Sequence, residues 1–192
     1  MINQVSTHAS DNKIQNSHKV LVAYEIGSGS TEEVADFIGN ILSQDGKIVE
    51  IKNIRDEIDL TSYDSIIIGS TIRYDNWMSN ARKFVKNNQE ILSKIPVAFF
   101  FTCLVLSRKT DKTIRKARGY FDKLYDIAPR VKPISVGGFA GVLDYSKISL
   151  VPRLILKLYL VILRVKEKIR VKEGDYRDWD AINSWVKSIN FR

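Results

Sequence analysis

The sequence predicts an α/β fold in which a doubly wound parallel sheet of five strands carries helices on both faces. Five apolar runs rich in β-branched and aromatic residues have the length of buried strands, and apolar residues with helical spacing lie between them. The runs occupy residues 19–24, 47–52, 65–70, 97–102 and 132–138. Because the runs are apolar almost without interruption, both faces of each strand are expected to be covered, as in parallel sheets.

One domain is expected over residues 19–192, with a disordered tail over residues 1–18. The chain has 192 residues and 44% apolar content, which suffices for one substantial core. The first eighteen residues show no periodicity, little apolar content and no apolar run of signal-peptide length.

The first strand leads into the loop GSGST, residues 27–31, and then into a helix. Ser30 followed by Glu33 has the spacing of a capping box, which predicts where this helix begins. A loop between a strand and a helix N-terminus presents unpaired backbone N–H groups, so it suits an anion such as a phosphate. The loop lacks the lysine of a P-loop and the glycine spacing of a dinucleotide fold, and a tight turn with a good cap remains the alternative.

Helices between and after the strands are predicted from shared apolar faces. These faces are Val34, Ile38, Ile41 and Leu42, then Ile114, Ala117, Phe121 and Leu124, and last Ile182, Trp185, Val186 and Ile189. Asp178 is expected to cap the last helix. Strands that alternate with helices in this way place ligands beyond the carboxyl ends of the strands.

Several kinds of chemistry are not expected from this composition. The single cysteine, Cys103, rules out an internal disulfide framework and is compatible with a reducing cytosol. Both histidines, His8 and His18, precede the first strand, so neither a zinc cluster nor a Ser/His/Asp triad is expected. Demanding chemistry would have to come from a cofactor.

Five segments in order carry a family resemblance. They are YEIGSGSTEEVA, GSTIRYDNWMSNARKFV, FFFTCLVLSRK, GGFAGVLDYSKIS and EGDYRDWDAI. Together they resemble flavodoxin-fold flavoproteins of the menaquinone-dependent protoporphyrinogen dehydrogenase type, from about residue 19 to the C-terminus. The resemblance implies strand order 2-1-3-4-5, FMN as cofactor, and oxidation of a reduced tetrapyrrole with electrons passed to a membrane quinone.

The same resemblance implies which residues hold FMN, and no side chain is assigned to catalysis because the chemistry is expected on the flavin. Ser28, Gly29, Ser30 and Thr31 would hold the phosphate. Ser70, Thr71, Ile72, Arg73, Tyr74 and Trp77 would border the isoalloxazine ring, with Thr102, Cys103 and Leu104 on its other side. Arg73 is also a candidate contact for a substrate carboxylate.

Alternatives remain open for several of these residues. Trp77 and Tyr74 either stack on the flavin or pack against the following helix. Cys103 either faces the ring or is a small buried apolar residue. Glu25 and Ile26 depart from the family pattern, because the family usually has a hydroxyl residue at the second position and Glu25 adds a carboxylate near the phosphate. A flavin-free interaction domain therefore stays open.

Residues 149–172 form an apolar segment with a basic strip, inserted before the last helix. Arg153, Lys157, Arg164 and Lys168 fall on one narrow helical face, and residues 153–172 hold seven basic residues and one acidic residue. Their charges interrupt the apolar run, which favours a helix lying on an anionic membrane surface over one that spans the membrane. Burial against this protein or its twin in a homodimer is the alternative.

The net charge of +8 has a second source in residues 108–118, which carry six basic residues and one acidic residue. This cluster is either a solvated helix face or a surface that steers an anionic tetrapyrrole. No nucleic-acid motif accompanies the charge, so nucleic acid is not an expected partner. The expected location is cytoplasmic, at the inner face of the cell membrane, and an electron carrier acting between soluble partners is the competing function.

Overall fold

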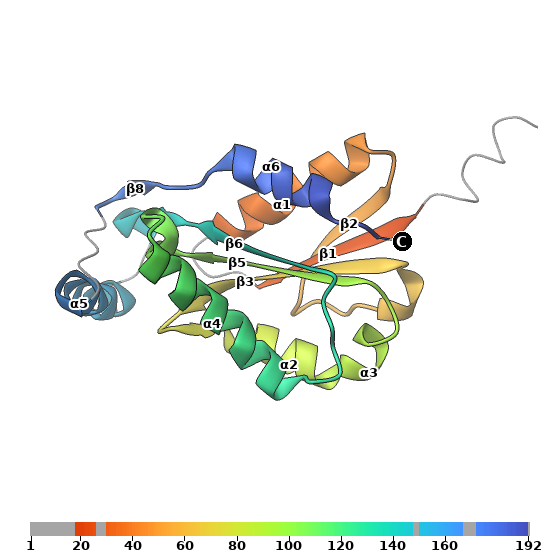
Figure 1. The fold of residues 1–192 in the computed structure, drawn as a ribbon, viewed down its shortest axis with the longest axis horizontal. Helices are drawn as coiled ribbons and strands as arrows, with labels where there is room; N and C mark the ends of the chain where they lie inside the picture. Colours follow the sequence, from red (N-terminus) through yellow and green to blue (C-terminus); the bar gives the residue numbers. More distant parts are fainter. Residues whose placement is uncertain (1–17, 26–29, 148–149, 167–171, 192) are drawn as a thin grey trace, which may run out of the picture.

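The computed structural model describes residues 18–25, 30–147, 150–166 and 172–191. A parallel sheet has the order β2-β1-β3-β5-β6, which confirms the predicted doubly wound topology (Figure 1). Its strands are β1 (Lys19–Glu25), β2 (Ile48–Asn53), β3 (Ser65–Arg73), β5 (Val97–Cys103) and β6 (Ser135–Ala140). The predicted tail lies outside the described residues except for His18, whose Nε2 is 2.8 Å from Ser65 Oγ.

Helices cover both faces of the sheet, as Figure 1 shows. On one face lie α1 (Ser30–Gln44) and α6 (Trp179–Ser188), and on the other lie α2 (Ser79–Asn87), α3 (Gln89–Leu92) and α4 (Asp111–Ile127). Asp178 caps α6 as predicted, accepting from the Ala181 amide at 2.9 Å. Helix α1 already includes Ser30, the residue predicted to cap it, and Ile114 is 39% exposed rather than on the buried face of α4.

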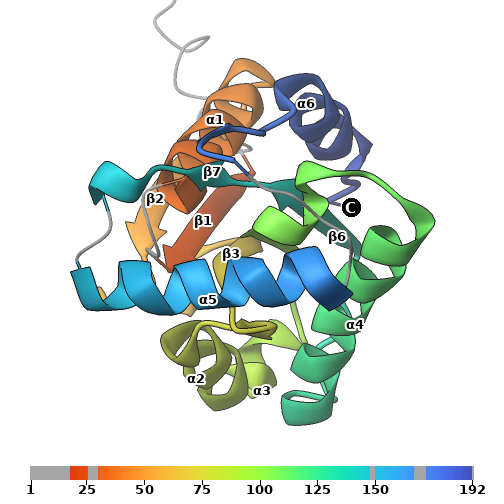
Figure 2. The same cartoon turned by 90° about the vertical axis from the view of Figure 1, so that its left-hand side faces the viewer.

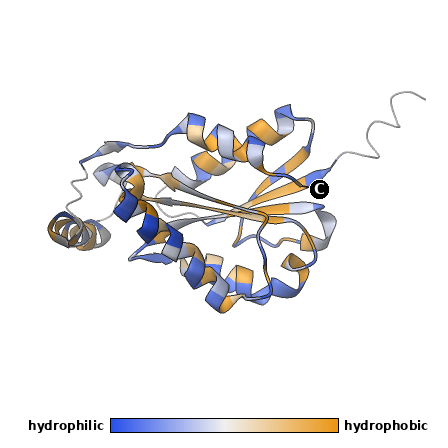
Figure 3. Cartoon of the chain, viewed as in Figure 1, coloured by the Kyte–Doolittle hydropathy of each residue, from blue (hydrophilic) through white to orange (hydrophobic). Residues whose placement is uncertain are grey.

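The apolar runs form central strands because both of their faces are covered. Ile66, Ile67 and Ile68 of β3 are fully buried, although they point to alternate sides of the sheet. Phe100 of β5 packs so closely on β3 that a Cβ at Gly69 would lie 2.0 Å from its ring. Figure 3 shows this apolar centre between the polar outer surfaces of the helices.

The insert before the last helix is confirmed as α5 (Leu150–Lys166), which crosses the carboxyl ends of the strands (Figure 2). A small antiparallel pair, β7 (Val142–Leu143) and β8 (Gly174–Asp175), brackets it in the chain. The two-residue strand β4 (Asn76–Trp77) pairs with β3. Three short 3₁₀ turns complete the described elements: η2 (Leu60–Ser62), η3 (Leu104–Ser107) and η4 (Tyr145–Lys147). Within the described ranges, no helix has both the length and the apolar character needed to cross a membrane.

Candidate functional site

A cavity lies at the carboxyl edge of the sheet, between the ends of β3 and β5 and beneath α5. The empty space between its walls is about 830 Å³, a figure that includes the open solvent at its mouth. Its walls are Ser30, Thr71, Ile72, Arg73, Tyr74, Thr102, Cys103, Leu104, Val105, Tyr120, Gly141, Val142, Leu143, Leu156 and Tyr159. Three of these residues, Ser30, Thr71 and Thr102, carry hydroxyl groups, and most of the others are apolar or aromatic.

Most of the residues singled out from the sequence meet in this cavity. Eight of them line it, and they come from the start of α1 and the ends of β3 and β5: Ser30, Thr71, Ile72, Arg73, Tyr74, Thr102, Cys103 and Leu104. Ser28 and Gly29 lie outside the described residues, as does Ile26. Thr31, Ser70 and Trp77 are described but do not line the cavity.

Thr31 and Ser70 lie behind the cavity wall and hold it in place. Thr31 Oγ1 is 2.7 Å from Thr71 Oγ1 and 2.8 Å from Thr102 Oγ1, so one hydroxyl joins the start of α1 to the ends of β3 and β5. Ser70 is fully buried, and its Oγ accepts from the Met78 amide at 3.2 Å. Both residues therefore support the wall from the protein side.

Replacing Thr31 by alanine should lower the free energy of unfolding by about 1–3 kcal/mol, because two hydroxyls at the wall then lose a partner. Urea unfolding followed by circular dichroism measures this loss. Thr31→Ser keeps the oxygen and should recover most of it. Equal stability of the two variants would show that the hydroxyl contributes nothing.

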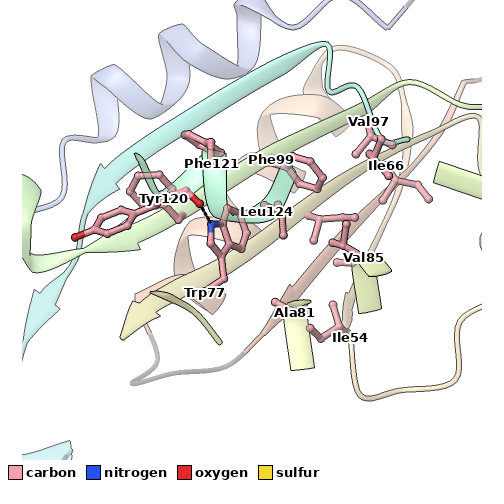
Figure 4. Close-up of a cluster of buried hydrophobic side chains, with 14 of the residues drawn as sticks. Ile54, Ile66, Trp77, Ala81, Val85, Val97, Phe99, Tyr120, Phe121 and Leu124 are labelled. Carbon is pink, nitrogen blue, oxygen red and sulfur yellow. Dashed lines mark hydrogen bonds between the residues drawn. The ribbon is translucent and has the colours of Figure 1, made fainter. Parts of the chain in front are cut away.

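Trp77 packs in the core, so it is not a wall of the cavity. It belongs to the short strand β4 (Asn76–Trp77) and is 3% exposed, with its ring edge-on to Phe99 and Phe101. Its Nε1 donates to the Tyr120 carbonyl at 2.8 Å, the dashed bond in Figure 4. The structure supports packing rather than stacking on a ligand, and the contacts come from β5 and α4, whereas the sequence predicted packing against the helix that follows Trp77.

The turn between β3 and β4 directs Tyr74 to the cavity instead. Tyr74 and Asp75 have φ angles of 51° and 58°, and β4 pairs antiparallel with the end of β3. Two residues with positive φ form the tight hairpin turn that suits the twist of paired strands. Tyr74 is 56% exposed and lines the cavity, so its ring is available to a ligand there, unlike the buried ring of Trp77.

Asp75 ties three elements together at the mouth of the cavity. Its Oδ1 accepts from the Tyr120 hydroxyl of α4 and the Tyr159 hydroxyl of α5, each at 2.8 Å, and its Oδ2 lies 3.0 Å from Lys116 Nζ. Burial raises the pKa of Asp75, but the bonds from Tyr120, Lys116 and Tyr159 outweigh this effect and hold the pKa below its ordinary value. The carboxylate therefore stays charged and fastens α5 over the cavity.

The fold and the cavity together agree with comparisons to known proteins. Residues 21–168 match the family model described as flavodoxin domain. The chain belongs to the flavodoxin domain family.

Curated relatives of this flavodoxin-domain protein carry the name that the sequence resemblance predicted. Protoporphyrinogen IX dehydrogenase [quinone] of Escherichia coli K12 is 27% identical, covering 89% of this chain and 94% of the relative. The Leishmania major protein of the same name is 29% identical, covering 90% of this chain and 75% of the relative. Among solved structures, two-electron reduced flavodoxin of Megasphaera elsdenii matches 62% of this chain and 84% of its own chain at 20% identity. The TM-score of 0.50 shows a similar fold.

The part of the cavity that comes after β6 was not predicted from the sequence. Gly141, Val142 and Leu143 line one side, and Leu156 and Tyr159 of α5 form its roof. A Cβ at Gly141 would lie 3.4 Å from Ser30 Oγ, an ordinary contact distance, so this wall lies close to the hydroxyl of Ser30. The run GGFAG could have indicated this wall from the sequence. The face of α5 that turns inward could not have been predicted, because the helix is apolar nearly all round.

Glu25 does not crowd the cavity. Its side chain is fully buried, and Oε1 accepts from Arg55 at 2.7 Å and from Asn80 at 3.0 Å, while Oε2 has no partner among the described residues. The guanidinium balances the carboxylate charge. The departure from the family pattern at this position therefore places no carboxylate on the described wall.

Cys103 lines the cavity but is 4% exposed. Burial raises the pKa of its thiol to about 12, so the thiol stays protonated at neutral pH and is a poor nucleophile. Among the described residues no group of His, Cys, Asp and Glu is arranged to hold a metal ion. The cavity thus offers hydroxyls, an arginine and apolar walls, a set suited to binding and positioning.

Proposed function

We propose that this chain is an FMN-dependent oxidoreductase that oxidises a reduced tetrapyrrole of the protoporphyrinogen type and passes the electrons to a quinone. The observation that carries the proposal is the cavity itself: segments 71–74 and 102–104, which the resemblance assigns to the flavin, face it from two strand ends. Relatives named for this activity match along about nine-tenths of the chain.

The cavity residues fit an FMN molecule at both of its ends. Ser30 brings a hydroxyl and the positive end of α1 to one end of the cavity, as a phosphate requires. Ile72 and Leu104 supply apolar walls for a planar ring. FMN, when bound, supplies the hydride chemistry that no described side chain can perform. The sequence contains no second nucleotide fingerprint, which favours FMN over FAD or NAD.

Cations around the cavity differ in how free they are to meet an anionic substrate. Lys116 and Lys109 of the basic cluster already pair with Asp75 at 3.0 Å and Asp178 at 2.7 Å. Arg73 lines the cavity from the end of β3. Arg73 is therefore the better candidate for a substrate carboxylate or for negative charge that develops in the cavity.

The purified protein should contain FMN or bind it at tens of micromolar or below, seen as flavin absorbance and by calorimetry. Ser30→Ala should weaken FMN about ten- to a hundredfold, since a hydrogen bond to a charged group contributes about 1.5–3 kcal/mol. Ser93→Ala, at the opposite edge of the sheet, is the matched control. If the wild-type protein does not bind FMN, a flavin-free interaction domain becomes the favoured interpretation.

Turnover separates the enzyme from the electron carrier. The FMN-loaded protein, given protoporphyrinogen IX and a menaquinone without oxygen, should produce fluorescent porphyrin. Flavin that is bound but exchanges electrons only with soluble partner proteins would contradict the enzyme and favour the carrier.

The outer face of α5 suits an anionic membrane surface. Leu154, Leu158, Val161 and Val165 are 71%, 64%, 55% and 73% exposed and follow helical spacing along one stripe. Arg164, on the basic strip beside them, is also exposed. Apolar side chains on one stripe and cations on its flank are the pattern of a helix that lies in a membrane interface. This placement at the inner face of the cell membrane would bring the cavity close to a quinone dissolved in the membrane.

The FMN-loaded protein should sediment with anionic vesicles and be released by salt, because each cation near the surface contributes on the order of 1 kcal/mol that salt screens. Leu158→Gln with Val165→Gln should abolish sedimentation and leave FMN affinity unchanged. Binding to neutral vesicles alone would contradict the electrostatic part. A concentration-dependent dimer without lipid, lost in the same variant, would assign the stripe to a second copy instead.

A further inference from the structure

Two cations of α5 share one aromatic ring at the edge of the cavity. Arg153 Cζ and Lys157 Nζ each lie 5.8 Å from the centroid of the Tyr145 ring. Arg153 also donates from Nη2 to the Tyr145 carbonyl oxygen. The ring and the carbonyl together fix the position of the guanidinium, which leaves its other N–H groups for a ligand.

Both cations belong to α5 and lie beside residues that line the cavity, although they are not part of its lining themselves. Tyr145 opens η4, two residues after Leu143, and Leu143 lines the cavity. Leu156, between the two cations along α5, lines the cavity from its roof. The two positive charges therefore sit where α5 meets the β7–η4 wall, and Arg73 belongs to a different wall at the end of β3.

The two charges lack a counterion among the described residues. Neither Arg153 nor Lys157 forms an ion pair there, and Arg153 Nε is buried without a hydrogen-bond partner. The nearby carboxylate of Glu173 accepts from the Tyr145 amide at 2.8 Å. Two like charges on one ring repel each other, and a buried unpaired donor is costly, so an anion between them would stabilise both.

We propose that Arg153 and Lys157 form a subsite for carboxylate groups of the ligand that occupies the cavity. The inference rests on the proposed function, in which those groups are the propionates of the tetrapyrrole. The planar guanidinium pairs with a carboxylate through two parallel bonds, and the ammonium adds a flexible point charge. The FMN phosphate carries similar anionic oxygens, so the experiment must separate the two sources.

Protoporphyrin IX and its dimethyl ester differ only in the two carboxylates, and they are the probes. With FMN-loaded protein in the same detergent buffer, porphyrin fluorescence should show the free acid binding at least tenfold more tightly than the ester. Arg153→Gln with Lys157→Gln should remove that difference and leave ester affinity unchanged. Arg164→Gln, an exposed cation on the same strip, should keep the difference. The charge-conserving exchange Arg153→Lys with Lys157→Arg should restore most of it.

Each contrary outcome has a distinct meaning. Equal binding of acid and ester by the wild-type protein would overturn the subsite while the proposed function stands. A double variant that loses FMN but keeps the acid–ester difference would assign the cations to the cofactor phosphate and overturn the proposal. If FMN binds and neither porphyrin does, both the subsite and the tetrapyrrole substrate fall.

Discussion

Replacing Trp77 by alanine should lower the free energy of unfolding by about 3–5 kcal/mol, the usual cost of truncating a buried aromatic side chain. The indole packs against Phe99, Phe101 and Phe121, and its N–H satisfies the Tyr120 carbonyl. The variant leaves both a void and an unpaired carbonyl in the core, so urea unfolding should detect the loss without FMN present.

Tyr74→Ala is the matched comparison, because Tyr74 is three residues away on the same hairpin. It is 56% exposed and lines the cavity, so its loss should change stability by about 0.5 kcal/mol or less while weakening FMN. A Trp77→Ala variant of native stability with weakened FMN would reverse the assignment of the two aromatic residues.

Replacing Asp75 by alanine should cost about 3 kcal/mol of stability and free α5 from the mouth of the cavity. Hydrogen bonds to a charged group contribute about 1.5–3 kcal/mol each, less where solvent screens them, and Asp75 accepts from Tyr120 and Tyr159 and pairs with Lys116. Alanine also tolerates the positive φ of this position less well than aspartate.

The reaction rate of the Cys103 thiol reports the position of α5 separately from the global stability of the protein. Cys103 is the only cysteine of the chain and lies in the cavity beneath α5, so its reaction with a maleimide reports opening of that helix. In the FMN-free protein, Tyr159→Phe removes the hydrogen bond from α5 to Asp75 and should speed this reaction about tenfold. Tyr120→Phe removes one contact from α4, which still reaches Asp75 through Lys116, and should leave the rate near that of the wild type. Equal rates in the wild type, Tyr159→Phe and Tyr120→Phe would show that the bond from Tyr159 to Asp75 does not hold α5 over the cavity.

The pH dependence of Asp75→Ala follows from the lowered pKa. A carboxylate with a lower pKa in the folded state stabilises fully above its ordinary value of 3.8, and the contribution disappears as pH falls through the folded value. The stability difference between wild type and Asp75→Ala should therefore be constant near neutral pH and shrink below about pH 4. A difference that persists in acid would assign the loss to backbone strain instead of charge.

Much of the site could be predicted from the sequence because it depends on parallel strands. Five apolar runs with helices between them place the ends of β3 and β5 at one edge. The family resemblance assigned Ser30, Thr71–Tyr74 and Thr102–Leu104 to the flavin, and all of them line the cavity at this edge. The insert was visible as a long basic apolar segment, whose position before the last helix the structure confirms.

Other features depended on contacts that no local pattern encodes. Trp77 and Tyr74 are both aromatic residues after a strand, and only the hairpin turn sends one into the core and the other to the cavity. Helix α5 is apolar nearly all round, so its periodicity cannot say which face is inward. The inward face carries Leu156 and Tyr159, and Tyr159 donates to Asp75, which lies 84 residues earlier in the chain. Local sequence sets strands, helices and the edge where their ends meet, because these depend on neighbouring residues. Which face of α5 covers the cavity, and which of Trp77 and Tyr74 enters the core, depend on side chains that meet only after the chain has folded.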